Sequence, residues 1–181
     1  MFLVLVLATS AQAQNTCSAK GVMGGQPFTL THCAVAFYES EHSVTLWLTD
    51  SAISEEELQR FQWSSDSWAL QAQHRRTMIQ MDFCPGGGKP QASADAVKAV
   101  AIQFRHAKIV LPGPQDQWVF SLPEDREIKI HALRGNLQRG GALSGKITGG
   151  VESAGHPFSW DIDFDVVLPM KAAGAGLGCG S

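Results

Sequence analysis

The sequence lacks the short motifs that mark a metal site or a catalytic nucleophile. No two of its four cysteines have CxxC spacing, and none of its six histidines takes part in an HxH, HxxxH or HExxH pattern. Those spacings place two ligands on one metal ion. The Gly-x-Ser-x-Gly pattern of a nucleophile elbow is also missing. The sequence therefore contains no local signature of metal chemistry or of covalent catalysis.

Signals of nucleotide and nucleic-acid binding are absent as well. The glycine run that precedes Lys89 lacks the spacing and the Ser or Thr of a phosphate-binding loop. The formal net charge is -3, and the sequence contains no basic stripe with interleaved aromatic residues. We therefore expect no nucleic-acid partner and no bound cofactor.

The one notable apolar run lies at the N-terminus, over residues 1–8. It is too short to span a bilayer, and Ala11-Gln12-Ala13 is the small-x-small pattern that signal peptidase recognises. We predict that residues 1–13 are a signal peptide and that residues 14–181 form a single domain. The absence of a preceding Lys or Arg departs from an ordinary signal peptide, and a buried N-terminal strand is the alternative. No later segment is long enough to span a membrane, so we expect a secreted or periplasmic protein.

Four cysteines remain after the predicted cleavage: Cys17, Cys33, Cys84 and Cys179. An even number in an exported chain predicts two disulfides, with three possible connectivities. Cys17 and Cys179 lie near the two ends of the mature chain. We therefore favour a Cys17–Cys179 bond that pins the termini and a Cys33–Cys84 bond between early strands.

The strongest structural pattern is a strict alternation over residues 158–168. Its apolar positions are Trp160, Ile162, Phe164, Val166 and Leu168, and its polar positions are Ser159, Asp161, Asp163 and Asp165. A period of two over this length predicts a strand with one buried face and one wet face. We interpret it as a central strand of a β-sandwich.

The rest of the chain supports an all-β fold. Weaker strand patterns cover residues 28–38, 43–49, 75–83, 96–111, 117–122, 127–133 and 142–148, whereas residues 18–26 resemble a glycine-rich lead-in. A helix remains the alternative for residues 97–104. Gly135 interrupts the pattern of its segment, which predicts a bulge there. The prediction is a single antiparallel β-sandwich of about seven to nine strands.

One short α-helix is predicted over residues 54–62. Ser54 and Glu57 form a capping box, in which each side chain bonds to the backbone N–H of the other residue. Ile53 and Leu58 occupy the hydrophobic staple positions on either side of it. Acidic residues in a first helical turn are favoured by the helix dipole, so these acids need no catalytic explanation.

The aspartate row Asp161, Asp163 and Asp165 is the most prominent candidate site. Successive members of the row lie roughly 6.6 Å apart on a strand, near the separation of glycosidase carboxylates, and their oxygens suit calcium. The alternative is a solvated sheet face, with Lys146 beside Asp161 and with Lys129 and His131 one strand further away. We favour this stabilising ladder and keep metal binding as a hypothesis.

The remaining candidates are Trp63, Trp68 and Trp118, which lie in or near connections. Such residues can anchor a ligand or partner, or they can seal the open ends of a sandwich. We interpret the chain as an exported, non-enzymatic binding or interaction module with an unknown protein or glycan partner. The alternatives are a secreted hydrolase acting on carbohydrate or cell-wall polymer, and an exported metal-binding protein.

Overall fold

The computed structural model describes residues 15–54, 56–58, 76–85, 97–105, 118–121, 128–153 and 155–173. Within these ranges the chain forms ten strands: β1 (Thr16–Met23), β2 (Gln26–Leu30), β3 (His32–Tyr38), β4 (Ser43–Thr49), β5 (Met78–Pro85), β6 (Val97–Arg105), β7 (Trp118–Ser121), β8 (Ile128–Gly135), β9 (Ala142–Ser153) and β10 (His156–Val167). No helix in this described part is long and apolar enough to cross a membrane.

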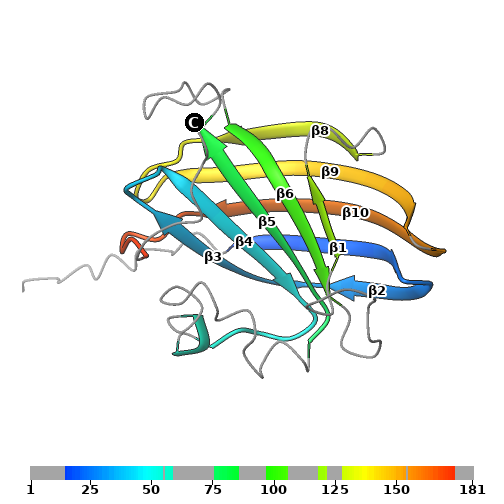
Figure 1. Ribbon diagram of the computed structural model, residues 1–181. Coiled ribbons are helices and arrows are strands. Elements are labelled where there is room, and N and C mark those ends of the chain that lie inside the picture. The colour runs from blue at the N-terminus through cyan, green and yellow to red at the C-terminus, as the bar shows by residue number, and fades with distance from the viewer. Residues whose placement is uncertain are drawn as a thin grey trace, which may run out of the picture.

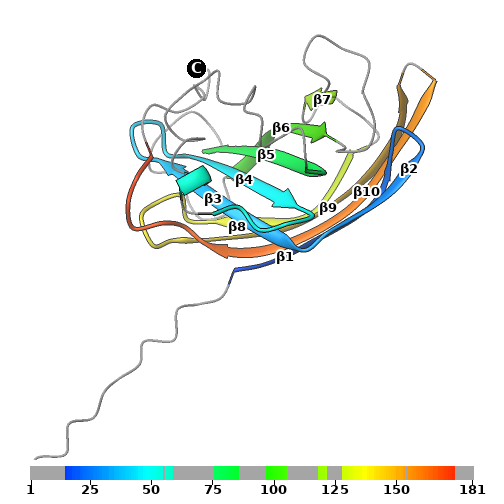
Figure 2. The same cartoon turned by 90° about the horizontal axis from the view of Figure 1, so that it is seen from below.

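The strands form two five-stranded sheets (Figure 1). Sheet A has the order β2-β1-β10-β9-β8, and sheet B has the order β3-β4-β5-β6-β7. All pairings within them are antiparallel. Figure 2 shows the two sheets packed one over the other. The predicted all-β sandwich with one short helix is confirmed.

The strand count exceeds the predicted seven to nine because the predicted strand over residues 28–38 divides into β2 of sheet A and β3 of sheet B, and because the glycine-rich lead-in is itself a strand. Its glycines lie mainly in the turn that follows, where Gly24 and Gly25 adopt φ of 58° and 83°. L-residues with side chains rarely adopt these values, so the turn needs glycine. Strand β1, which directly precedes this turn, buries Ala19 and Met23 against the core. Residues 18–26 therefore form most of β1, the turn and the first residue of β2.

Strand β10 lies at the centre of sheet A, as its alternation predicted. Its inward side chains are all buried, and Phe164 packs on Phe83 of sheet B with ring centroids 5.5 Å apart. Gly145 lies opposite Phe164 in the register. A Cβ added to Gly145 would come within 2.6 Å of the Phe164 ring, so this position must stay small. The two sheets thus enclose one apolar core.

The helix start is confirmed in detail. Ser54 N donates to Glu57 Oε2 at 2.9 Å, and Glu57 N donates to Ser54 Oγ at 3.2 Å, which is a capping box. Arg76 Nη1 donates to Glu57 Oε1 at 3.0 Å, and this bonding lowers the pKa of Glu57 to about 2. Ile53 and Leu58 pack against the outer face of sheet B. The helical residues in the described part are residues 56–58.

The bulge in β8 lies earlier than predicted. The register between β8 and β9 shifts between Ile130 and Ala132, so His131 is the extra residue. Gly135 pairs regularly with Leu143. A Cβ at Gly135 would lie 2.7 Å from Leu143 Cδ1, so packing and not a bulge explains this glycine.

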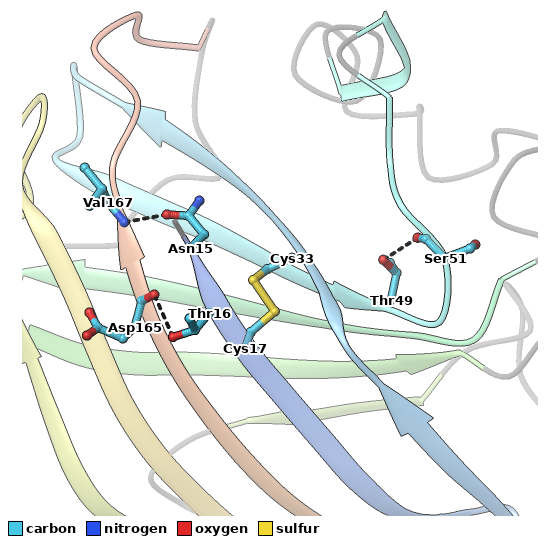
Figure 3. Close-up of a disulfide and its surroundings, with 8 residues drawn as sticks. All are labelled: Asn15, Thr16, Cys17, Cys33, Thr49, Ser51, Asp165 and Val167. Carbon is cyan, nitrogen blue, oxygen red and sulfur yellow. Dashed lines mark hydrogen bonds between the residues drawn. A yellow bond between two sulfur atoms is a disulfide. The ribbon is translucent and has the colours of Figure 1, made fainter. Parts of the chain in front are cut away.

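The predicted disulfide pairs are wrong, because Cys17 bonds to Cys33 (Figure 3). The chain leaves sheet A at the end of β2 and enters sheet B as β3, which brings Cys33 next to β1. The two Cα atoms are 6.1 Å apart, an ordinary disulfide distance. Cys84 is also disulfide-bonded, and its partner lies outside the described residues, as does Cys179. The Cys17–Cys33 bond therefore links the two sheets.

Candidate functional site

A hydrogen-bonded group of polar side chains lies on the outer face of sheet B. We call Tyr38, Thr45, Trp47, Gln80 and Asp82 the sheet B polar cluster. Side chains alternate along a strand, so those pointing away from the apolar core share this face. The register places Thr45 opposite Asp82 and Trp47 opposite Gln80. All five residues are nevertheless buried.

The cluster is joined by short hydrogen bonds. Thr45 Oγ1 donates to Asp82 Oδ1 at 2.8 Å. Gln80 Nε2 donates to both carboxylate oxygens of Asp82, at 3.1 Å each. Trp47 Nε1 donates to Gln80 Oε1 at 2.8 Å. Tyr38 bonds to Thr45 and so completes a continuous chain of polar groups across three strands.

Burial sets the protonation of this cluster. It raises the pKa of the Asp82 carboxyl, while the bonds from Gln80 and Thr45 oppose that rise. Burial also raises the pKa of the Tyr38 hydroxyl. A carboxyl with a raised pKa beside a tyrosine is a combination found in acid–base sites. Here Asp82 is only 7% exposed and Gln80 and Thr45 only 1%, so these groups bond to one another and not to solvent. The arrangement is that of a structural network.

Ser43 lies at the margin of this cluster, opposite Tyr38 in the register. Its hydroxyl is buried and has no hydrogen-bond partner in the described part of the chain. A buried polar group without a partner lowers the free energy of unfolding.

The predicted aspartate row lies on the outer face of sheet A. Lys146 Nζ is 3.2 Å from Asp161 Oδ1, which confirms the predicted neighbour, and Lys20 Nζ is 4.0 Å from Asp161 Oδ2. Asp163 and Asp165 are exposed to solvent. This is the arrangement of a solvated charge ladder.

Neither chemical hypothesis for the row gains support from this geometry. Among the described residues, no three His, Cys, Asp or Glu side chains are grouped so that they could hold a metal ion. The hydrolase hypothesis needs a carboxylate in an apolar, enclosed setting, and Asp163 and Asp165 face water instead. Metal binding by Asp161, Asp163 and Asp165 stays a prediction.

The aromatic candidates are left largely untested. Trp63 and Trp68 lie outside the described residues. Trp118 is the first residue of β7, where it pairs with Phe104 of β6 at the edge of sheet B. Ligand binding by these three residues stays a prediction.

A second polar surface, which the sequence did not identify as a site, lies along β8, the last strand of sheet A in the described part of the chain. Lys129, His131 and Arg134 are exposed on this strand, and His131 Nε2 lies 2.6 Å from Thr148 Oγ1 on β9. Ile130 is 42% exposed. The sequence did place Lys129 and His131 on an outward face, but it could not show that their strand ends the sheet.

Comparison of the chain with models of protein families, with curated proteins and with solved structures finds no match.

Proposed function

We propose that this chain is an exported, disulfide-stabilised β-sandwich that binds a protein or glycan partner and does not catalyse a reaction. One observation carries the proposal: the enclosed carboxyl, Asp82, is used within the fold, whereas Lys129, Arg134, Asp163 and Asp165 are exposed on the outer face and edge of sheet A. A buried, fully bonded acid suits stability, and an exposed charged surface suits recognition.

Export is supported by the disulfide and by its position. Disulfides persist in oxidising compartments, and Cys17 forms one only a few residues after the predicted cleavage at Ala13. Asn15 is already part of the fold, because its Oδ1 accepts a bond from Val167 N at 2.8 Å (Figure 3). A mature chain beginning at Gln14 would keep all of these contacts.

The proposal is tested with the mature chain, residues 14–181, purified with its disulfides intact. The chain is screened against immobilised glycans and against proteins extracted from its own compartment, and in parallel against polysaccharide substrates. We expect saturable binding of a partner that is recovered unchanged. Turnover of a polysaccharide that is lost in Asp163→Asn would overturn the proposal in favour of a hydrolase.

A further inference from the structure

Strand β8 forms an open edge of sheet A. It has eight residues and pairs with β9 on one side. Within the described part of the chain, nothing pairs with its other side. An edge strand presents unpaired N–H and C=O groups there, which can accept an extended segment from another chain.

Two other described edges are less open. Strand β2 is five residues long and includes Pro27, which has no N–H to donate. Strand β3 is already bonded, because Ala173 N donates to Phe37 O at 2.7 Å. Strand β8 contains no proline and is longer than β2. If an extended partner adds to one of these three edges, β8 is therefore the best suited.

The side chains of β8 define the chemistry of such a partner. Lys129, His131 and Arg134 are exposed, and the strand contains no acidic residue. Lys129 and Arg134 form no ion pair with any described residue. Ile130 adds an exposed apolar contact on the opposite side of the strand, where it pairs with the buried Ile147. The edge therefore combines free backbone, positive charge and one apolar contact.

This combination selects against a second copy of the chain. Two β8 strands pairing with each other would bring cations close to cations, and such pairs destabilise a sheet. Lysines on an edge strand are among the features that protect edges from indiscriminate association. An acidic extended segment is attracted to this edge, whereas a second copy is repelled, because the carboxylates of the segment can pair with Lys129 and Arg134.

We propose that the free edge of β8 docks an extended acidic segment of a partner protein, which adds to sheet A as a further strand. This inference rests on the proposed binding function and names the partner class. Acidic side chains of the segment face Lys129 and Arg134, and its apolar side chains face Ile130. The backbone bonds supply affinity, and the charges supply selectivity.

The experiment uses the intact mature protein and two synthetic peptides of about eight residues, the length of β8. One peptide alternates Glu and Val, and the matched peptide alternates Lys and Val. Binding is measured by fluorescence polarisation, and the contact is mapped by amide hydrogen exchange. We expect the acidic peptide alone to bind, more weakly as salt is added, and to protect amides of β8.

The double variant Lys129→Glu/Arg134→Glu should bind the acidic peptide about tenfold or more weakly, because two favourable cross-strand pairs become repulsive. Lys20→Glu is the matched control, since Lys20 lies on the outer face of the same sheet but on β1. The control should bind as the wild type does.

Several results would overturn the inference: equal binding of the two peptides, equal binding by the double variant, or protection on strands other than β8. A dimer of the free protein whose interface protects β8 would assign the edge to a second copy. Binding of a polyanionic glycan without backbone protection would assign it to a charged surface only. If the peptides fail but the partner screen succeeds, the docking inference falls and the proposed function stands.

Discussion

The two sheets use polar residues in different ways. On sheet A, the outward side chains of β10 are intermediate or exposed, and its charges form a ladder in water. On sheet B, all seven residues of β4 are buried, including Ser43, Thr45 and Thr49. A polar residue on a strand therefore marks a wet face in one sheet and an enclosed network in the other.

This difference has energetic consequences. Exposed ion pairs contribute little to stability, typically about 0–1 kcal/mol. Removing one partner of a buried hydrogen bond lowers the free energy of unfolding by more, because the remaining group stays buried without a partner. Substitutions of similar chemistry on the two sheets should thus have unequal effects.

The largest effect is expected in the core that both sheets share. Phe164→Ala should lower the free energy of unfolding by about 3–5 kcal/mol, because it removes a buried ring packed on Phe83. Asp165→Asn changes the next residue of β10, which lies on its solvent-exposed face. It should change the free energy of unfolding by less than about 0.5 kcal/mol. Urea unfolding monitored by tryptophan fluorescence measures both. Similar losses in the two variants would contradict the assigned faces of β10.

Removing the bond between the sheets should have the next largest effect. Cys17→Ala/Cys33→Ala should lower the free energy of unfolding by about 2–4 kcal/mol, since the closed loop no longer restricts the unfolded chain. The measurement is urea unfolding without reductant, so that the disulfide of Cys84 stays intact. A double variant as stable as the wild type would contradict the stabilising role assigned to this disulfide.

Matched threonine substitutions compare the two outer faces directly. Thr45→Val removes the donor to Asp82 with little change of shape and should cost about 1–3 kcal/mol. Thr148→Val on sheet A removes a bond to the exposed His131 and should cost less than about 0.5 kcal/mol. Thermal unfolding of the two variants side by side checks the order. The reverse order would contradict the buried network.

The smallest expected change in the free energy of unfolding is an increase and not a loss. Ser43→Ala removes a buried hydroxyl that has no partner in the described residues, so stability should stay unchanged or rise by up to about 1 kcal/mol. Ser144→Ala on the outer face of sheet A is the control and should be neutral. A clear loss of stability in Ser43→Ala would mean that this hydroxyl is bonded in solution.

Sequence patterns predicted the outward face of β10 better than that of β5 for a physical reason. Alternation identifies a face only when one side of a strand is wet, and β10 satisfies that condition. The segment around Asp82 alternates in the same way, but its polar side is covered. The burial of Asp82 depends on what packs over the sheet, which no local pattern reports.

The other differences also depend on long-range arrangement. The Cys17–Cys33 bond follows from the crossing of the chain between the sheets, and positions along the sequence do not reveal this crossing. The open edge at β8 follows from the strand order. By contrast, the helix start was predictable because the bonds between Ser54 and Glu57 are local.

Asp82 belongs to a buried structural network, and the pH dependence of the free energy of unfolding tests this placement most directly. Because burial raises the pKa of Asp82 above 3.8, the folded state retains a proton that the unfolded state has lost. The stability that this proton contributes is fully present below the pKa of Asp82 in the unfolded state. It is lost as pH rises through the pKa of Asp82 in the folded state. Asp82→Asn has no such carboxyl to titrate.

Free energies of unfolding should therefore be measured for the wild type and Asp82→Asn from about pH 4 to pH 8, with Asp163→Asn as the exposed control. The wild type should lose stability relative to Asp82→Asn as pH rises, and the difference should level off above the folded pKa. Asp163→Asn, which leaves the Asp82 network intact, should also lose stability relative to Asp82→Asn as pH rises. Parallel curves for the wild type and Asp82→Asn would contradict the account.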